Sequence, residues 1–311
     1  MADKLRFAVI GVGYLGRFHA LIYSRLPDVE LVGVVDTDPE RARAVAEEAG
    51  CAVFDSLEVI ADQVDAVSVV VPTTAHLAVA EPLLRRGIHM LLEKPIAATR
   101  EEGKRIVDLA DQSGAILQIG HLERFNAGVM ALAEHIDHPR FVEIQRMGEF
   151  VERATDVDVV SDLMIHDIDI ILSLMRSELH SVSAVGTPVL TNRVDIANAR
   201  LEFANGAVAN VVASRVSDRK TRRIRVFQER KYLSLDCSEQ TIDIAYPHLA
   251  EGATRPEIVR ERIQVVPVKP LDREIEAFVV CVREHRRPLV DGRVGLEALD
   301  VALKVRDCMG H

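Results

Sequence analysis

The N-terminal stretch "AVIGVGYLGRFHA" constrains the fold more than any other feature of this 311-residue sequence. It places Gly11, Gly13 and Gly16 in G-x-G-x-x-G spacing, directly after a short apolar run and at the start of a helix-like segment. The first glycine permits a tight turn, the second lets the backbone approach a pyrophosphate, and the third lets helix and strand pack closely. The N-terminus of the helix adds free N–H groups and the positive end of a dipole. The pattern therefore predicts a dinucleotide-binding turn in a parallel α/β sheet.

Asp36 supports this interpretation. The next strand-like run, "ELVGVVD", ends in Asp36, 20 residues after Gly16. A carboxylate at that position accepts hydrogen bonds from a ribose diol and repels a 2′-phosphate, so NAD is favoured over NADP. The alternative is that the glycines only form a tight turn and that Asp36 caps the helix that follows.

The first 121 residues alternate apolar runs with amphipathic segments of helical length. Runs such as "DAVSVVVP" and "HMLLEKP" are strand-like, and Gly50, Gly87 and Gly114 stand where helices are expected to end. This alternation is typical of an α/β fold in which helices cover both faces of a doubly wound parallel sheet. Residues 1–121 are therefore predicted to form a dinucleotide-binding Rossmann domain.

The rhythm changes in residues 122–311. Several adjacent strand-like stretches follow His180, and Asn205-Gly206 separates two alternating stretches as a two-residue hairpin turn would. Hairpin-connected strands predict an α+β domain built on a largely antiparallel open sheet. We expect this domain to bind the substrate and to support oligomerisation. The closing segments 271–309 have the pattern of amphipathic helices, which can pack back on the first domain.

Charge and composition limit the classes of function. With 38 Lys and Arg against 48 Asp and Glu the formal net charge is −10, which disfavours binding to nucleic acid or to an anionic membrane surface. No apolar segment approaches the roughly 20 residues needed to cross a bilayer. The four cysteines are widely scattered and form no C-x-x-C motif, which argues against a disulfide framework and a zinc knuckle. We therefore expect a cytoplasmic protein without membrane insertion.

Lys94 is the first candidate for chemistry. It ends the strand-like run "HMLLEKP" and is expected at the carboxyl edge of the sheet, where open α/β sheets bind ligands and where the glycine turn also lies. Pro95 restricts the residue before it to an extended conformation, which limits the movement of the lysine. The alternative is a surface lysine that pairs with Glu93.

The segment "SDLMIHDIDII" carries the second candidate. On an α-helix Asp162, His166 and Asp169 lie at i, i+4 and i+7 and share one face, whereas Asp167 points elsewhere. A carboxylate one turn from a histidine can set its tautomer and basicity, which suits a general base near neutral pH. Asp162 could instead cap the helix, and His166 could be a core histidine. No metal site is expected, because only two or three possible ligands are visible.

The glycine turn, "VVPTTAH", "EKP" and D-x-x-x-H-x-x-D occur in this order, and with them the whole chain resembles the Gfo/Idh/MocA family of NAD(P)-dependent sugar and cyclitol oxidoreductases. The resemblance runs nearly end to end, including the closing "PLVDGRVGLEALDVALKV". It implies that Lys94 is an active-site lysine, that His166 is the catalytic acid/base, and that Asp162 helps to orient the substrate. Many members carry glycine midway between that aspartate and the histidine, where this chain has Met164.

The resemblance also implies ligand contacts. Thr73 and His76 would lie beside the nicotinamide ribose. The segment "GHLERFN" looks most like the UDP-N-acetylglucosamine 3-dehydrogenase branch, which prepares a 3-amino sugar for lipid A. The expected substrate contacts are Arg124, Asn126, Asp162 and Asp169. The expected cofactor contacts are Gly11, Gly13, Tyr14, Leu15, Gly16, Asp36, Thr73, His76, Glu93 and Lys94.

The main hypothesis is thus NAD-dependent oxidation of a secondary ring hydroxyl of a sugar or nucleotide sugar. The alternatives are a dehydrogenase of a free sugar or inositol, a carbonyl or imine reductase that uses NADPH, and a non-catalytic NAD(P)-binding sensor. The open sheet could bury one face against another subunit, which predicts a homodimer or homotetramer. The basic run "SRVSDRKTRRIRVFQERK" could meet a diphosphate, but its alternation is more typical of a solvated sheet face.

Overall fold

The computed structural model describes residues 4–151, 157–251 and 254–310, which divide into two compact units. The first unit runs to His121 and also includes Leu271–Leu299. The second contains Leu122–Pro270 and the residues from Asp300 onward. Among the described helices, none is both long enough and apolar enough to cross a membrane.

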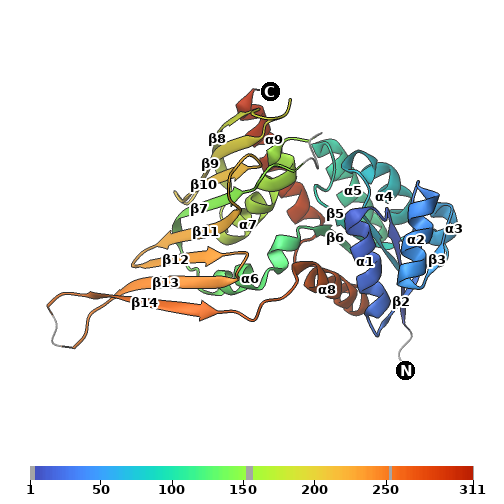
Figure 1. The fold of residues 1–311 in the computed structure, drawn as a ribbon, viewed down its shortest axis with the longest axis horizontal. Coiled ribbons are helices and arrows are strands. Elements are labelled where there is room, and N and C mark those ends of the chain that lie inside the picture. The colour runs from blue at the N-terminus through green and yellow to red at the C-terminus, as the bar shows by residue number, and fades with distance from the viewer. Residues whose placement is uncertain (1–3, 152–156, 252–253, 311) are drawn as a thin grey trace. The chain divides into compact units, whose positions relative to one another are not determined.

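Sheet A of the first unit has six parallel strands in the order β3-β2-β1-β4-β5-β6 (blue to green in Figure 1). Chain order runs outward in opposite directions from β1 and β4, so the predicted doubly wound parallel sheet is confirmed. The strands are β1 (Leu5–Ile10), β2 (Val29–Val35), β3 (Ala52–Val53), β4 (Ala66–Val69), β5 (His89–Glu93) and β6 (Leu117–Gly120). The helices between them are α1 (Tyr14–Arg25), α2 (Pro39–Ala49), α3 (Leu57–Ala61), the 3₁₀ turn η1 (Thr73–Ala75), α4 (His76–Leu84) and α5 (Arg100–Ser113).

The helices begin and end at residues that satisfy their free backbone groups. The side chain of Asp38 accepts hydrogen bonds from the first turn of α2, and Thr99 with Glu102 forms a capping box at the start of α5. α2 and α5 end at Gly50 and Gly114, whose φ angles of 69° and 72° lie in the left-handed region that glycine adopts readily. The helix ends predicted at these two glycines are confirmed.

A helix from near the other end of the chain completes the core of sheet A. Phe7 of β1 is fully buried; its ring centroid lies 4.7 Å from that of Tyr23 on α1 and 5.9 Å from that of Phe278 on α8 (Pro270–Glu284). The last helix, α9 (Gly292–Met309), contributes residues up to Leu299 to this unit and its remaining residues to the other.

Sheet B of the second unit has eight strands in the order β14-β13-β12-β11-β7-β10-β9-β8 (Figure 1). Only the pairing of β7 with β10 is parallel within the described strands, so the predicted largely antiparallel sheet is confirmed. Its strands are β7 (Pro139–Met147), β8 (Leu179–Thr187), β9 (Ile196–Phe203), β10 (Val208–Ser214), β11 (Thr221–Gln228), β12 (Lys231–Asp236), β13 (Thr241–His248) and β14 (Glu257–Gln264). The helices of this unit are the 3₁₀ turn η2 (Leu122–Phe125), α6 (Ala127–Glu134), the π-helical η3 (Val160–Met164) and α7 (Ile165–Met175).

The two faces of sheet B differ in polarity. Val142, Val226 and Leu233 are neighbours across β7, β11 and β12, and all three are buried. On the opposite face Glu143 pairs with Arg225. The basic run of the sequence therefore contributes strand β11, in which buried Ile224 and Val226 alternate with arginines. The alternating sequence favoured this interpretation, a solvated sheet face, over a diphosphate contact.

The hairpin between β9 and β10 is longer than predicted. The N–H of Phe203 donates to the carbonyl of Ala207, and the N–H of Gly206 donates to the carbonyl of Phe203. Gly206 has a φ of 78°, whereas Asn205 has no positive φ, so the connection is a three-residue loop that ends in a left-handed glycine. The two-residue turn inferred from Asn205-Gly206 is wrong, because an alternating sequence marks a hairpin without fixing the length of its loop.

Asp195 organises the loop between β8 and β9. Its fully buried carboxylate accepts backbone N–H bonds from Val189, Leu190 and Thr191 at 2.8, 2.7 and 2.8 Å. The Thr191 hydroxyl donates to it at 2.7 Å, and Nε of Arg215 lies 3.2 Å from it. Although burial raises the pKa of a carboxyl group, these hydrogen bonds lower the pKa of Asp195 to about 2.

We expect Asp195→Asn to lower the free energy of unfolding at pH 7 by about 2–4 kcal/mol, because Arg215 and three N–H groups lose a buried charge. A carboxyl with a folded-state pKa of about 2 stabilises the fold above its unfolded pKa of about 3.9 and loses that contribution as the pH falls towards about 2. Urea unfolding at pH 7 and pH 3 should therefore show a smaller acid loss in the variant than in the native chain.

Asp243→Asn is the matched control. It removes an exposed pair with Arg262 and should cost less than about 1 kcal/mol. Equal losses in the two variants would contradict the anchoring role of Asp195.

Candidate functional site

The glycine turn lies at the carboxyl edge of sheet A, where β1 meets β4. Gly11 has a φ of 83°, and its N–H donates to the carbonyl of Val35 at 2.8 Å. A Cβ on Gly11 would lie 2.5 Å from the carbonyl oxygen of Val70, the residue after β4. Since chain order diverges from β1 and β4, the turn occupies the crevice in which open α/β sheets bind ligands.

The other two glycines of the motif have different surroundings. A Cβ on Gly16 would lie 1.9 Å from the carbonyl oxygen of Gly11, so only glycine allows α1 to approach β1 this closely. A Cβ on Gly13 would meet nothing within 4 Å. Gly13 is also the N-cap residue of α1, and no side chain caps the helix there. The free space beside Gly13 and the N-terminus of α1 therefore fit the pyrophosphate of a dinucleotide.

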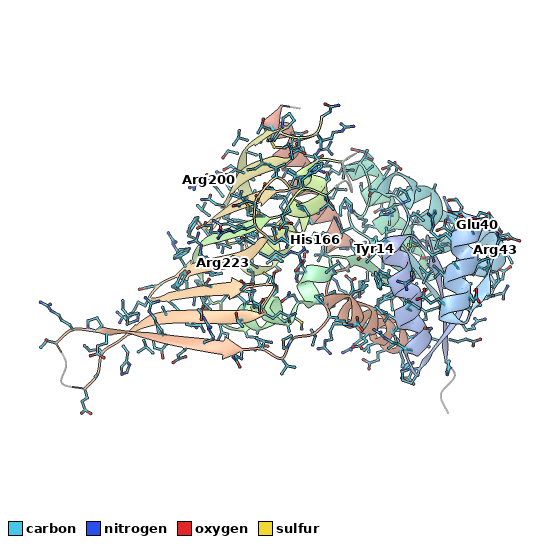
Figure 2. The ribbon with its side chains drawn as sticks, in the orientation of Figure 1. Tyr14, Glu40, Arg43, His166, Arg200 and Arg223 are labelled. Atoms are coloured by element: carbon cyan, nitrogen blue, oxygen red, sulfur yellow. The ribbon has the colours of Figure 1, made fainter. Side chains whose placement is uncertain are left out.

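A cavity of about 610 Å³ opens at this turn. Its volume lies in the range of about 300–1,000 Å³ that is typical of ligand pockets. Val70, Val71, Pro72, Ala75 and Val79 form a wall that the sequence did not identify. The predicted cofactor residues that line the cavity are Gly11, Gly13, Tyr14, Leu15, Gly16 and Asp36. Thr73, His76, Glu93 and Lys94 lie outside this lining. Tyr14 is labelled at the start of α1 in Figure 2.

Asp36 follows β2 at the same edge of the sheet. Its carboxylate accepts hydrogen bonds from the N–H groups of Val12 and Asp38 at 2.7 and 2.8 Å, and from Nε and Nη2 of Arg41 at 3.1 and 2.7 Å. Although burial raises the pKa of Asp36, these bonds hold it below its ordinary range. The alternative that Asp36 caps α2 is wrong, because Asp38 holds that position. A fixed carboxylate beside the cavity suits a ribose diol.

Lys94 follows β5 at the carboxyl edge of sheet A, half-buried. Its backbone N–H donates to Oε2 of Glu93 at 3.2 Å, and Oε1 of the same glutamate lies 3.4 Å from Nε2 of His19. The Lys94–Pro95 peptide bond is cis. Glu93 is 6% exposed, so its carboxylate is directed into the unit towards α1 rather than into solvent.

Thr73 and His76 lie between β4 and α4. Thr73 begins η1, and His76 begins α4 with only 1% of its surface exposed. Nδ1 of His76 lies 3.3 Å from the carbonyl oxygen of Ile96, and Nε2 lies 3.1 Å from that of Val71. Burial lowers the pKa of His76, although the two carbonyls oppose this. Contact of these residues with a nicotinamide ribose stays a prediction.

The helix of His166 begins one turn earlier than predicted. Oδ1 of Asp158 accepts the N–H groups of Val160 and Ser161 at 3.0 and 2.9 Å, so the alternative in which Asp162 caps this helix is wrong. The first five helical residues, Val160–Met164, form a π-helix. A π-turn is wider than an α-turn, and residues four apart in it still project from one side of the helix, so the shared face of Asp162 and His166 stays a prediction.

His166 lies on α7 and is 8% exposed (Figure 2). Asp169 follows one turn later, is 1% exposed, and accepts a hydrogen bond from Nη1 of Arg124 at 3.2 Å. The structure thus brings together two predicted substrate contacts. Asn126 caps α6 with its side-chain oxygen and donates to the carbonyl of Cys237 at 2.9 Å. Contact of Arg124, Asn126 and Asp169 with substrate stays a prediction.

Comparisons with known proteins agree with this geometry. Residues 5–121 match a family model described as an oxidoreductase family with an NAD-binding Rossmann fold, and residues 129–234 match the Gfo/Idh/MocA C-terminal domain. A UDP-N-acetylglucosamine 3-dehydrogenase of Acidithiobacillus ferrooxidans is 38% identical over 97% of this chain and 96% of that protein. The chain belongs to the Gfo/Idh/MocA family. It is therefore an NAD-dependent oxidoreductase, as the order of its motifs predicts.

Solved structures and other relatives extend the similarity. A structure of the Acidithiobacillus ferrooxidans UDP-N-acetylglucosamine 3-dehydrogenase has a TM-score of 0.93 and 37% identity, with 98% of this chain and 97% of that chain covered. An inositol 2-dehydrogenase of Rhizobium meliloti is 29% identical over 96% of this chain and 94% of that protein. Members of the Gfo/Idh/MocA family with different named substrates thus share the whole length of this chain.

Sequence reasoning missed a buried charge network in this family member. Arg146 of β7 donates to Asp167 on α7 at 2.7–3.0 Å and to Glu123 of η2 at 3.1 Å. All three side chains are at most 6% exposed. Although burial lowers the pKa of Arg146, the two carboxylates raise it above its ordinary value. The alternation of β7 signalled a buried position at Arg146, but nothing in the sequence indicated which acids would meet it.

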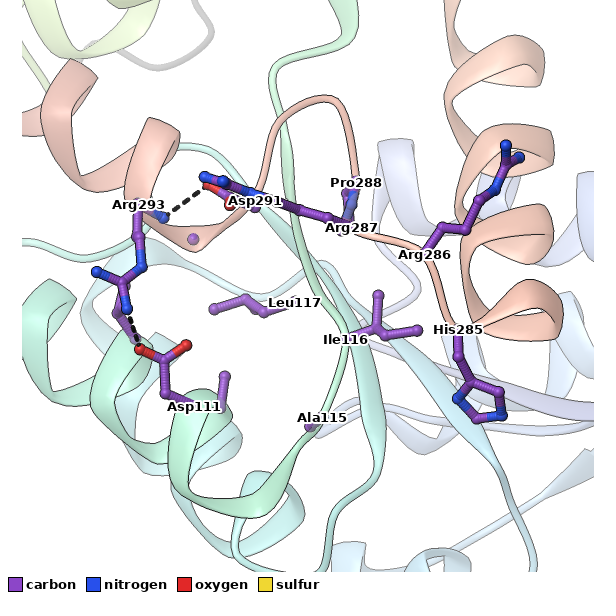
Figure 3. Close-up of a pocket in the computed structure, with 13 residues that line it drawn as sticks. Asp111, Ala115, Ile116, Leu117, His285, Arg286, Arg287, Pro288, Asp291 and Arg293 are labelled. Carbon is purple, nitrogen blue, oxygen red and sulfur yellow. Dashed lines mark hydrogen bonds and ion pairs between the residues drawn. The ribbon is translucent and has the colours of Figure 1, made fainter.

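A second cavity of about 320 Å³ lies at the opposite end of β6 (Figure 3). It is bordered by Ile116 and Leu117 at the start of that strand and by three arginines with carboxylate partners, of which Arg286 pairs with Glu284. Arg287 pairs with Asp291, and Arg293 donates to Asp111 at 2.6 Å. The motif residues all lie elsewhere, so this cavity is not the dinucleotide site. Within the described ranges, no group of three or more His, Cys, Asp or Glu side chains could hold a metal ion.

We expect Gly13→Ala and Gly16→Ala to fail for different reasons. Gly13→Ala should keep the free energy of unfolding within about 1 kcal/mol of the native value, because its Cβ meets no atom. It should weaken NAD binding by about tenfold or more, because the methyl group enters the space assigned to the pyrophosphate. Gly16→Ala should unfold at markedly lower temperature, since its Cβ overlaps the Gly11 carbonyl. Thermal unfolding and calorimetric NAD titration measure the two effects, and native-like NAD affinity in Gly13→Ala would refute the assignment.

Proposed function

We propose that this oxidoreductase oxidises a secondary ring hydroxyl of UDP-N-acetylglucosamine, at the 3-position. The observation that carries the proposal is the end-to-end similarity to a UDP-N-acetylglucosamine 3-dehydrogenase, at 38% identity over 97% of the chain. The inositol dehydrogenases among its relatives favour a free cyclitol or sugar as the second candidate. Both substrates present a secondary alcohol, so one arrangement of acid and base groups can serve either.

In the proposed reaction His166 takes the hydroxyl proton as general base, and Lys94 donates a hydrogen bond to the same oxygen. The lysine thereby stabilises the negative charge that develops on that oxygen, an effect that increases where water is excluded. Asp162 orients the substrate, and Arg124, Asn126 and Asp169 contribute contacts to it in this proposal. When bound, NAD supplies the hydride acceptor.

The lysine and the histidine each have surroundings that support these roles. Lys94 stands at the end of a parallel strand on the edge that carries the dinucleotide cavity, with its backbone N–H fixed by Glu93. His166 lies on a helix that is held by the ion pairs of Asp167 and Asp169, which follow it in the sequence by one and three residues. A base on a fixed helix loses little orientational freedom when substrate binds.

We expect Lys94→Ala and His166→Ala each to reduce NADH formation from NAD and UDP-N-acetylglucosamine by about 10²-fold or more, the usual cost of losing an acid–base group. Absorbance of NADH at initial rate measures this. Free N-acetylglucosamine and inositol, tested beside the nucleotide sugar, distinguish the two candidate substrates.

Lys104→Ala is the matched control, because Lys104 is an exposed lysine on α5 and has no assigned role. It should retain native turnover. Native-like rates in both Lys94→Ala and His166→Ala would end the proposed mechanism. Turnover of inositol but not of the nucleotide sugar would replace the substrate.

We further propose that the chain forms a homodimer or homotetramer through the exposed face of sheet B. Phe227 stacks on Phe141 with ring centroids 5.5 Å apart and lies 5.0 Å from Tyr232. Beside this group Ile258 of β14 is 69% exposed, and together with Pro247 it borders a shallow groove of about 400 Å³. A contiguous apolar surface of this kind is typical of a protein contact.

We expect Ile258→Asp to shift the chain towards a smaller species in multi-angle light scattering, because it places a charge in the apolar groove. Val59→Asp is the control, since Val59 is 52% exposed but lies on α3 of the other unit. A native chain that is monomeric at all concentrations would contradict the proposal.

We also propose a cytoplasmic location. All four cysteines are free, and burial raises the pKa of the Cys51 thiol to about 11. Thiols that are kept reduced are typical of the cytoplasm. Recovery of the protein from a periplasmic or membrane fraction would reject this location.

A further inference from the structure

Two buried histidines hold the segment that carries Lys94, one on each side of it. His19 on α1 faces Glu93, the residue before Lys94, and His76 on α4 faces the carbonyl of Ile96, two residues after it. His19 is 0% exposed and His76 is 1% exposed. Neither histidine lines the dinucleotide cavity, and neither is needed for the proposed proton transfer.

His76 joins the segment after β5 to the loop after β4. Its Nδ1 lies 3.3 Å from the Ile96 carbonyl oxygen and its Nε2 lies 3.1 Å from the Val71 carbonyl oxygen. Val71 is part of the wall of the dinucleotide cavity. The imidazole therefore lies between the cofactor wall and the lysine segment, and a neutral ring, which carries one N–H, donates to one of these carbonyls at a time. An apolar residue of similar size would leave the accepting carbonyl without this donor, which is costly for a buried group.

His19 joins the other end of the segment to the helix of the glycine turn. Its Nε2 lies 3.4 Å from Oε1 of Glu93, and its Nδ1 lies 3.1 Å from Oγ of Ser68 on β4. The Ser68 hydroxyl is in turn 2.8 Å from the hydroxyl of Tyr23. The Glu93 carboxylate also accepts the backbone N–H of Lys94. Buried polar groups thus line the way from α1 to the lysine backbone, and His19 and Glu93 approach each other at 3.4 Å without a hydrogen bond between them.

Glycine at position 120 completes this arrangement. A Cβ on Gly120 would lie 2.8–2.9 Å from the carboxylate atoms of Glu93. The glutamate therefore fills the space that a side chain on β6 would take, and it has little room to turn away from His19. The conformation of the lysine segment is consequently over-determined by contacts from α1, α4, β4 and β6.

We propose that His76 and His19 are positioning residues that couple the walls of the NAD cavity to the placement of Lys94, with His76 acting through the Ile96 carbonyl and His19 through Glu93. The expected loss of turnover rests on the catalytic role of Lys94 in the proposed function. The expected change in the exposure of the Lys94 amine does not. A histidine that only filled the core could be replaced without changing the exposure or reactivity of the lysine amine.

Three variants of His76 separate the mechanical effect from simple loss of core packing. Asn places its amide nitrogen near the position of Nδ1, and Gln places its amide nitrogen near the position of Nε2. His76→Asn can therefore still donate to Ile96 in the lysine segment, His76→Gln can still donate to Val71, and His76→Ala can donate to neither.

The measurement is the rate at which acetic anhydride acetylates Lys94 in the full chain, read by peptide mass spectrometry and normalised to Lys104 in the same sample. We expect a rise of about threefold or more in His76→Ala and His76→Gln, because local opening exposes the amine. His76→Asn should remain close to the native rate.

His89→Asn is the matched control. His89 is a half-buried histidine at the opposite end of β5, where its Nδ1 accepts the N–H of Ile116 at 3.0 Å. It should leave the labelling of Lys94 unchanged. Equal Lys94 labelling in the native chain, His76→Gln and His76→Asn would overturn the proposal, and this comparison stands if His76→Ala does not fold.

Turnover gives an independent readout. In His76→Gln we expect kcat to fall by about tenfold or more, because a displaced catalytic group lowers the rate of the chemical step. Failure of every variant and of the native chain to oxidise the tested sugars would defeat the proposed substrate, but the labelling result would still decide the positioning role.

Discussion

The direct contact between the backbones of α1 and β1 is the constraint on which the first unit depends. The Cβ position of Gly16 lies 1.9 Å from the Gly11 carbonyl oxygen, so helix and strand meet with no side chain between them. This contact places the N-terminus of α1 directly at the end of β1, where the carboxyl ends of β2 and β4 lie on either side. The free N–H groups at the N-terminus of α1 then lie among three features of the cavity. These are the open side of Gly13, the fixed carboxylate of Asp36 and the wall that begins at Val70. A site for a diphosphate follows from a single close approach of two elements.

The parallel topology also explains why a lysine at the end of β5 belongs to the same edge as this turn. In a parallel sheet every strand delivers its last residue to one side, but strand direction alone does not fix a long, flexible side chain. The buried histidines supply what the strand lacks, since one reaches Glu93 and the other reaches the Ile96 carbonyl. Burying polar groups is unfavourable unless each finds a partner. Here the Glu93 carboxylate lies 3.4 Å from His19 on one side of Lys94 and the Ile96 carbonyl lies 3.3 Å from His76 on the other, so polar contacts restrict the lysine segment from both sides.

Features set by local chemistry or by periodicity could be predicted from the sequence, whereas features set by packing between distant elements could not. The glycine spacing identified the turn, and the alternation of apolar runs with helical segments identified sheet A. The same reasoning used α-helical spacing for Asp162 and His166, but it could not foresee the π-turn from Val160, because that turn depends on how the helix starts at Asp158. The pairing of Arg146 with Asp167 was equally invisible, since the two lie on different elements and no periodicity relates them.

The charges around α7 show why such pairings matter for chemistry. Every residue from Ile165 to Ile171 is buried, so α7 has no exposed face and apolar packing alone would specify its rotation weakly. Asp167 and Asp169 point to different partners, Arg146 and Arg124, and a rotation of the helix would break both pairs. Buried ion pairs add little net stability compared with apolar residues, but breaking one leaves an unpaired buried charge at a cost of about 3–5 kcal/mol. The pairs therefore favour the observed rotation of α7. Since His166 precedes Asp167 directly, these two ion pairs fix the side of α7 from which its imidazole projects.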